Sequence, residues 1–184
     1  MPGVIRTRVG YCGGKKVDPT YYDLGDHSET IQIDFDPTKI TFEQLLTAFW
    51  ELHNPCQSSF SRQYMCAVFH HNQQQRAVAI KTRDQLATQL ERAIETKILP
   101  VTKFYLAEDY HQKYQLRSAK ELLKEFQAVY PDLASLLSST AVTRVNCYLG
   151  GHGKLSQLKT EIDLFGLSDH GKQQLLESAA RYLK

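Results

Sequence analysis

The chain has 184 residues, of which 42% are hydrophobic and 23% are charged, and its formal net charge is +2. These values describe an ordinary globular protein of one domain, or of one domain with an appendage. The balance of 22 basic against 20 acidic residues gives no reason to expect a nucleic acid or a membrane as partner. No apolar run approaches the roughly 20 residues that a membrane-spanning helix needs. The N-terminal residues contain no apolar signal core, so we expect a cytoplasmic protein, although a longer form could carry an organelle signal.

The cysteines of the chain form no CxxC pair and no zinc-ligand spacing. They are Cys12, Cys56, Cys66 and Cys147. We interpret them as reduced thiols, because small disulfide-stabilised scaffolds are denser in cysteine. The pair His27 and Glu29 offers only two ligands, so we expect no metal site.

Two strands and one helix are predicted in the first third of the chain. Residues 4–9 are rich in β-branched side chains and predict a strand, which the following glycines should break. Residues 29–35 alternate apolar and polar side chains, the pattern of a half-buried strand. Thr41 should open a helix, because Gln44 follows three residues later in a capping-box pattern.

The rest of the chain continues with a strand at 64–69, a helix at 73–95, a strand at 98–105 and a loop at 107–114. Beyond Arg117 only helical segments are predicted, the first of them opened by a second capping box at Ser118 and Glu121. Strands followed by a run of helices indicate an α+β fold.

Several spaced motifs agree, in order, with those of one protein family. They are Gly10-Tyr11-x-Gly13-Gly14, Pro19-Thr20-Tyr21, His27-x-Glu29, Phe35-Asp36-Pro37, Gln63-Tyr64 and Ala107-Glu108-Asp109-Tyr110-His111-Gln112-x-Tyr114. Together they resemble the peptide-methionine (S)-S-oxide reductase family, methionine sulfoxide reductase A, over roughly the first two thirds of the chain. Agreement among several motifs is far more specific than any one of them.

The resemblance implies a ferredoxin-like two-layer α+β sandwich at residues 1–116, with a helical C-terminal extension at 117–184 packed on it. The family's nucleophilic cysteine lies in a Gly-Cys-Phe-Trp segment, which this sequence does not contain. The family's first strand and helix lie in the same N-terminal region, so we expect an incomplete family domain. Their absence would leave a strand edge and an apolar helix face exposed.

The family is an oxidoreductase family that reduces the S epimer of methionine sulfoxide, free or in proteins, to methionine. In this reaction a cysteine thiolate attacks the sulfoxide sulfur, a second thiol converts the resulting sulfenic acid to a disulfide, and thioredoxin reduces the disulfide. Dithiothreitol replaces thioredoxin in vitro, and no bound cofactor is expected. We expect a monomer. The alternatives are a catalytically inactive, truncated form that acts by binding or is vestigial, and a thiol enzyme that uses Cys12.

Five residues match the family's site positions. Glu29 matches the acid, which must hold a proton near neutral pH, so we expect it to be buried beside aromatic rings. Tyr21 and Tyr64 match the phenols that donate hydrogen bonds to the sulfoxide oxygen without carrying charge. His111 and Tyr114 match positions in or beside the substrate pocket.

Two cysteines are candidate thiols for the reaction. Cys12 is either a small buried thiol, the interpretation that we favour, or a substitute nucleophile. Cys147 lies in the part of the chain where the family often keeps recycling cysteines, and it is either a resolving thiol or an ordinary one.

Overall fold

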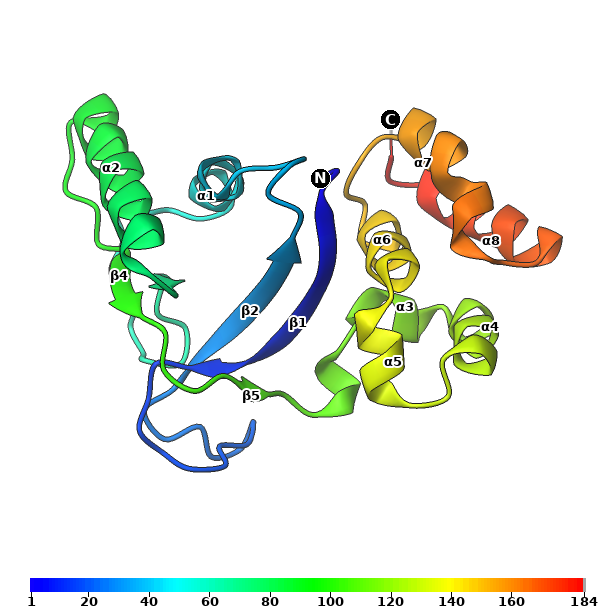
Figure 1. Cartoon of the computed structure of the whole chain (residues 1–184), viewed down its shortest axis with the longest axis horizontal. Helices are drawn as coiled ribbons and strands as arrows, with labels where there is room; N and C mark the ends of the chain where they lie inside the picture. The colour runs from blue at the N-terminus through cyan, green and yellow to red at the C-terminus, as the bar shows by residue number, and fades with distance from the viewer. Residues whose placement is uncertain (184) are drawn as a thin grey trace.

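A computed structural model describes residues 1–183 and shows a curved sheet between two groups of helices (Figure 1). Two helices from the N-terminal half lie on one side of the sheet, and the helices of the C-terminal third lie on the other. The predicted α+β class is therefore confirmed.

The main sheet is antiparallel and has the strand order β2-β1-β5. Its strands are β1 (Val4–Cys12), β2 (Ser28–Phe35) and β5 (Tyr105–Leu106). Strand β1 continues through Gly10, which pairs with Thr30 and Leu106, so the prediction that the glycines break the strand was wrong at this position. A Cβ atom at Gly10 would collide with the Tyr105 carbonyl oxygen and the Phe104 ring. Glycine therefore permits close approach of β5 at this position.

Two parallel strands form a second, separate hydrogen-bonded sheet. It consists of β3 (Ala67–His70) and β4 (Lys97–Pro100), which α2 (Gln73–Leu90) connects. The single strand predicted at 98–105 is thus divided between two sheets. Pro100, which has no N–H to donate, is the last residue of β4.

The capping box of α1 (Phe42–Glu51) is confirmed. The Thr41 hydroxyl accepts from the Gln44 N–H at 3.2 Å, and the Gln44 side chain accepts from the Thr41 N–H at 2.8 Å. The helix buries Leu46 and Trp50 in a cluster with residues of α2 and β3. Helix α2 ends before the predicted residue 95, because Glu91 adopts a left-handed conformation with φ 51°.

The chain after β5 is helical, as predicted, and residues 117–183 contain no strand. Its elements are η1 (Asp109–His111), α3 (Tyr114–Ser118), α4 (Lys120–Val129), α5 (Leu133–Ser138), α6 (Thr140–Leu149), α7 (Leu155–Glu161), η2 (Ile162–Phe165) and α8 (Asp169–Ala180). The second capping box was a wrong prediction: Ser118 ends α3, its hydroxyl donating to the Tyr114 carbonyl oxygen at 3.4 Å. Helix α4 begins after Ala119 with no side-chain cap.

The buried apolar side chains form three clusters, one of which joins Tyr11 and Leu24 to Ala107. The largest lies within residues 116–183, mostly on the C-terminal helices, and begins at Leu116. The domain division at residue 116 stays a prediction. No helix within residues 1–183 is long and apolar enough to cross a bilayer.

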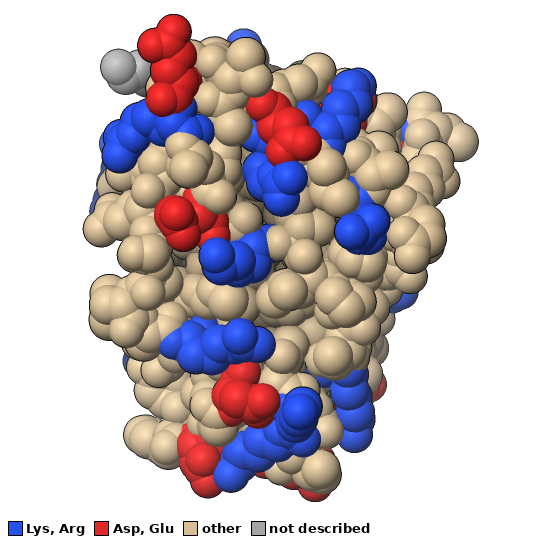
Figure 2. All heavy atoms as spheres, turned by 90° about the vertical axis from the view of Figure 1, so that its left-hand side faces the viewer, with Lys and Arg blue, Asp and Glu red and all other residues tan. Residues whose placement is uncertain are grey.

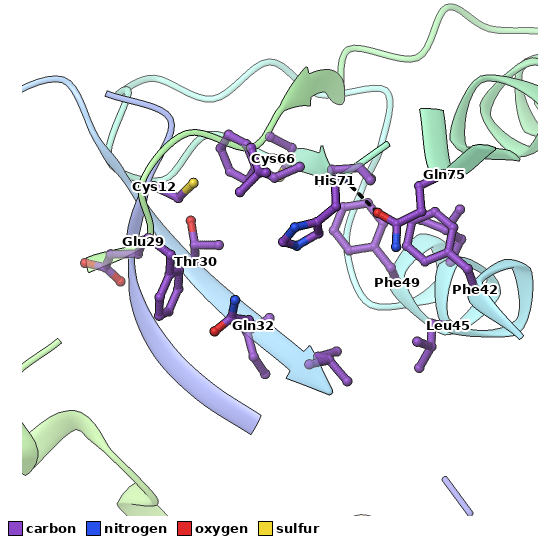
Figure 3. A pocket seen from close by; sticks show the side chains of 18 of the residues that line it. Cys12, Glu29, Thr30, Gln32, Phe42, Leu45, Phe49, Cys66, His71 and Gln75 are labelled. Carbon is purple, nitrogen blue, oxygen red and sulfur yellow. Dashed lines mark hydrogen bonds between the residues drawn. The ribbon is translucent and has the colours of Figure 1, made fainter. Parts of the chain in front are cut away.

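An apolar groove of about 440 Å³ separates β2 from α1 and β3 (Figure 3). Its walls include Ile33, Phe42, Leu45, Phe49 and Val68. Within residues 1–183, β2 has one strand neighbour, and its other edge borders this groove. The groove thus combines a strand edge with an apolar helix face.

The face of the molecule that carries α2 has charges of both signs interspersed (Figure 2). Two ion pairs contribute to this pattern: Lys81 with Glu43 at 3.0 Å and Arg83 with Asp84 at 2.7 Å. Exposed pairs of this kind add little stability. On this face the basic side chains therefore form no stripe of a single sign.

Lys113 joins the main sheet to the C-terminal helices. Its ammonium group is buried and donates to the Thr7 carbonyl oxygen at 2.9 Å, the Thr7 hydroxyl at 3.0 Å and the Thr143 hydroxyl of α6 at 2.8 Å. Burial, together with the positive charge of Arg8, lowers the pKa of Lys113 to about 8. A neutral amine is therefore favoured in the folded state far more than in the unfolded chain.

Stability should consequently rise with pH across the range in which only unfolded Lys113 binds a proton. Below about pH 8 both states are protonated, and above the ordinary lysine pKa of 10.5 neither is, so the gain lies between these values. We expect the Lys113 contribution to the free energy of unfolding to increase by about 3 kcal/mol over this range. Urea unfolding at a series of pH values measures it. Lys113→Met should flatten the rise and the exposed control Lys124→Met should not; an unchanged slope in Lys113→Met would contradict the prediction.

Candidate active site

A cavity of about 470 Å³ opens on the face of the β1–β2 pair that carries Tyr11. We call it the active-site cavity. Its walls include all five site residues predicted from the sequence, which are Tyr21, Glu29, Tyr64, His111 and Tyr114. These residues come from four separate segments of the chain, and the fold brings them together around one space.

Strand register determines which side chains face this cavity. Tyr11 pairs with Glu29, and Cys12 pairs with Ser28. Because directly paired residues project on the same side of a sheet and successive residues on opposite sides, Tyr11 and Glu29 share one face while Cys12 faces the other. Figure 3 shows Glu29 pointing away from the apolar groove, into which Cys12 and Thr30 point.

One wall of the cavity depends on a pairing of Tyr11 with Glu108. The buried Tyr11 hydroxyl donates to one Glu108 carboxylate oxygen at 2.6 Å, and the Tyr21 backbone N–H donates to the other at 3.0 Å. Burial alone would raise the pKa of Glu108, but these two donors outweigh it and hold the pKa below its usual range. Burial, reinforced by the Glu108 carboxylate, raises the pKa of the Tyr11 phenol. Glu108 is therefore an ionised acceptor that positions Tyr21.

The sequence assigned no role to this pair, although both residues lie in the family motifs. A tyrosine in a strand and a glutamate almost 100 residues later have no local pattern that links them. The two segments meet where β5 pairs with β1.

An aromatic pair forms another part of the wall. The rings of Tyr21 and His111 lie 4.7 Å apart between centroids and are tilted by 47°. The His111 Nε2 atom is buried and has no hydrogen-bond partner among residues 1–183. Buried polar atoms are nearly always paired. The structure therefore leaves this buried nitrogen unpaired among residues 1–183.

Gln63, the residue before Tyr64, holds Glu29 in place. The Gln63 side-chain amide donates to the Glu29 carboxylate at 2.7 Å, and the Glu29 N–H donates to the Gln63 carbonyl oxygen at 3.0 Å. The Glu29 side chain is exposed in the open cavity. The expectation that Glu29 is buried beside aromatic rings was therefore wrong, because the nearby rings leave its outer side open to solvent.

The segment that carries Tyr64 is anchored through Arg62. The Ser28 hydroxyl donates to the Arg62 carbonyl oxygen at 2.7 Å, and the Arg62 guanidinium donates to the carbonyl oxygens of Gly13 at 3.0 Å and Asp26 at 3.1 Å. Three backbone segments are thus tied to the start of β2. These bonds fix the position from which Tyr64 reaches the cavity.

His27 has a structural role beside the cavity. Its buried ring accepts a hydrogen bond from the Gly14 N–H at Nδ1, 3.1 Å away, and its Nε2 lies 2.9 Å from the Lys16 carbonyl oxygen. This arrangement assigns the proton to Nε2 and uses both ring nitrogens. Within residues 1–183 no group of three His, Cys, Asp or Glu side chains could hold a metal ion.

None of the four cysteines lines the active-site cavity within the described part of the chain. Cys12 is fully buried, and its sulfur lies 3.8 Å from the Thr102 hydroxyl. This placement favours the small buried thiol over the substitute nucleophile. Cys147 lies on α6, where its thiol faces the His152 carbonyl oxygen at 3.7 Å.

Comparison with known proteins gives one consistent family. Residues 1–137 match the family model described as "Peptide methionine sulfoxide reductase". A peptide methionine sulfoxide reductase of Drosophila melanogaster is 40% identical over 175 residues, which cover 93% of this chain and 69% of the relative. MsrA of Methanosarcina acetivorans is 39% identical over 126 residues, covering 62% and 66% of the two chains. The chain therefore spans about two thirds of the length of these relatives.

Solved structures agree with the sequence matches. Methionine sulfoxide reductase A of Corynebacterium diphtheriae superposes with a TM-score of 0.56 at 30% identity, over 65% of this chain and 66% of the other. Mxr1 of Saccharomyces cerevisiae in reduced form gives a TM-score of 0.59 at 26% identity, over 64% and 74% of the chains.

Gly13, whose carbonyl oxygen accepts a hydrogen bond from Arg62, has no room for a side chain. It has φ +87°, and a Cβ atom there would lie 2.7 Å from the Phe69 ring. We expect Gly13→Ala to lower the free energy of unfolding by about 2–4 kcal/mol, from left-handed strain plus the clash. Gly166→Ala is the matched control, because Gly166 has φ +71° but no neighbour within 4 Å, and it should cost only about 1 kcal/mol. Urea unfolding measures both; equal losses would contradict the proposed clash.

Proposed function

This chain belongs to the peptide methionine sulfoxide reductase family, and on that premise we propose that it serves the reduction of the S epimer of methionine sulfoxide to methionine. The substrate is free methionine sulfoxide or an oxidised methionine in a protein. The observation that carries the proposal is the convergence of Tyr21, Glu29 and Tyr64 on the active-site cavity.

The chemistry of the sulfoxide group explains this set of side chains. The sulfoxide oxygen is an acceptor, and it must gain protons as the sulfur–oxygen bond breaks. The Tyr21 and Tyr64 hydroxyls can donate to it as neutral groups, and the Glu29 carboxyl can transfer a proton. His111 and Tyr114 add aromatic surface to the wall of the cavity.

Reduction also requires two thiols. One thiolate attacks the sulfoxide sulfur and becomes a sulfenic acid, which a second thiol converts to a disulfide with loss of water. We propose thioredoxin, or dithiothreitol in vitro, as the reductant of that disulfide. The described residues therefore supply binding and proton transfer, and the attacking thiol must reach the cavity from outside its present lining.

The cavity lining also favours a second candidate function, which is binding of methionine sulfoxide without turnover. Its basis is that Cys12 faces the apolar groove rather than the active-site cavity. The two candidates share the same substrate and the same contacting residues. They differ only in whether a thiolate reaches the bound sulfur.

Glu29→Gln tests the proton-transfer role in a chain extended to carry the family's Gly-Cys-Phe-Trp segment. Glutamine keeps the size and polarity of Glu29 but cannot transfer a proton. We expect kcat to fall by about 10²–10⁴-fold. The measurement is dithiothreitol-dependent reduction of a peptide that contains the S epimer. Glu121→Gln, on the exposed face of α4, should leave kcat unchanged.

Unchanged turnover of Glu29→Gln at neutral pH would remove this residue from the acid role. Binding of the S epimer without reduction by the 184 residues alone would favour the second candidate. Reduction by this chain that is lost in Cys12→Ser would show instead that Cys12 is the nucleophile.

A further inference from the structure

Three exposed aromatic side chains outside the cavity lining each lie next to an aromatic residue that lines it. Tyr22 is 89% exposed, Phe60 is 92% exposed, and Tyr110 is half exposed. We call these three the aromatic rim. Rings that are left this open gain nothing from the fold, and clustered exposed apolar groups commonly mark a binding surface.

Each ring of the aromatic rim contacts an aromatic residue of the cavity wall. Tyr22 meets Tyr21 edge to face with centroids 5.5 Å apart, and Phe60 lies 6.0 Å from the Tyr64 ring. Tyr110 lies 4.2 Å from the ring of His111. The rim is therefore continuous with the cavity walls, and it extends the aromatic surface outward from three different segments.

A free methionine sulfoxide bound in the cavity would leave the outer rings uncovered. A polypeptide whose oxidised methionine enters the cavity must lay its neighbouring residues across the mouth, where the rim stands. Tyrosine and phenylalanine bury large apolar areas against such residues with little loss of side-chain entropy.

We infer that the aromatic rim selects oxidised methionines that are flanked by aromatic or large aliphatic residues in an extended polypeptide. This inference rests on the proposed function, because it assumes that the cavity receives the sulfoxide side chain. It narrows the substrate to protein-bound methionine sulfoxide in apolar sequence surroundings.

The test compares two labelled peptides that each carry one central S-methionine sulfoxide, flanked either by Phe and Leu or by Ser and Gly. Fluorescence anisotropy with the full chain measures their dissociation constants. We expect the apolar peptide to bind at least about tenfold more tightly. Phe60→Ser and Tyr22→Ser should each reduce this ratio several-fold. Both side chains are almost fully exposed, so neither change should affect folding.

Leu164→Ser is the matched control, because Leu164 is 79% exposed on η2 and lies outside the cavity lining. It should leave the ratio unchanged. Equal binding of the two peptides, or a ratio that Phe60→Ser does not alter, would overturn the inference. Competition by free S-methionine sulfoxide, which Phe60→Ser should not change, tests the proposed function separately. If the flanks change binding equally for oxidised and reduced peptides, the rim selects flanking residues but the cavity does not recognise the sulfoxide. If neither peptide binds, both the inference and the proposed function are wrong.

Discussion

The antiparallel pairing of β1 with β2 is the constraint on which the rest of the structure depends. Its register sets Tyr11 opposite Glu29, so that both project into the active-site cavity. The same register places Cys12 opposite Ser28, on the side of the apolar groove. A shift by one residue would exchange the two faces, because side chains alternate along a strand. The register therefore decides which side chains face the substrate cavity and keeps Cys12 out of it.

Buried polar groups hold the elements around this pair in place. The Gln112 side chain bonds to the backbone as a neighbouring strand would. Its amide oxygen accepts from the Val9 N–H at 3.1 Å, and its amide nitrogen donates to the carbonyl oxygens of Val9 at 2.8 Å and Ala107 at 3.0 Å. Lys113, the next residue, reaches Thr7 and α6. A buried amide or amine is costly unless its bonds are made. These two residues therefore define how the segment that carries His111 lies against β1.

Much of this architecture was predictable because its signals are local. The strand β2 and the Thr41–Gln44 box were predicted from neighbours within four residues, and both elements were confirmed. The half-buried alternation predicted for β2 was wrong at Ile31, which is 56% exposed. The convergence of Tyr21, Glu29 and Tyr64 followed from the family motifs rather than from any local pattern. The failures have tertiary causes. Ser118 had the right spacing for a cap, but α3 already included it, and no local signal shows that an outer face of the Glu29 side chain stays open to water.

The two carboxylates near the cavity are suited to different tasks by their partners. Glu108 accepts from the Tyr11 hydroxyl and the Tyr21 N–H, and its lowered pKa keeps it ionised, so it orients Tyr21 and holds no transferable proton. Among residues 1–183, the Glu29 carboxylate accepts from the Gln63 amide alone, and Glu29 lines the open cavity. A side chain that exchanges a proton with substrate must be reachable and must not be committed to fixed donors. Of the two, Glu29 meets these conditions better, which supports the proposal that Glu29 transfers the proton.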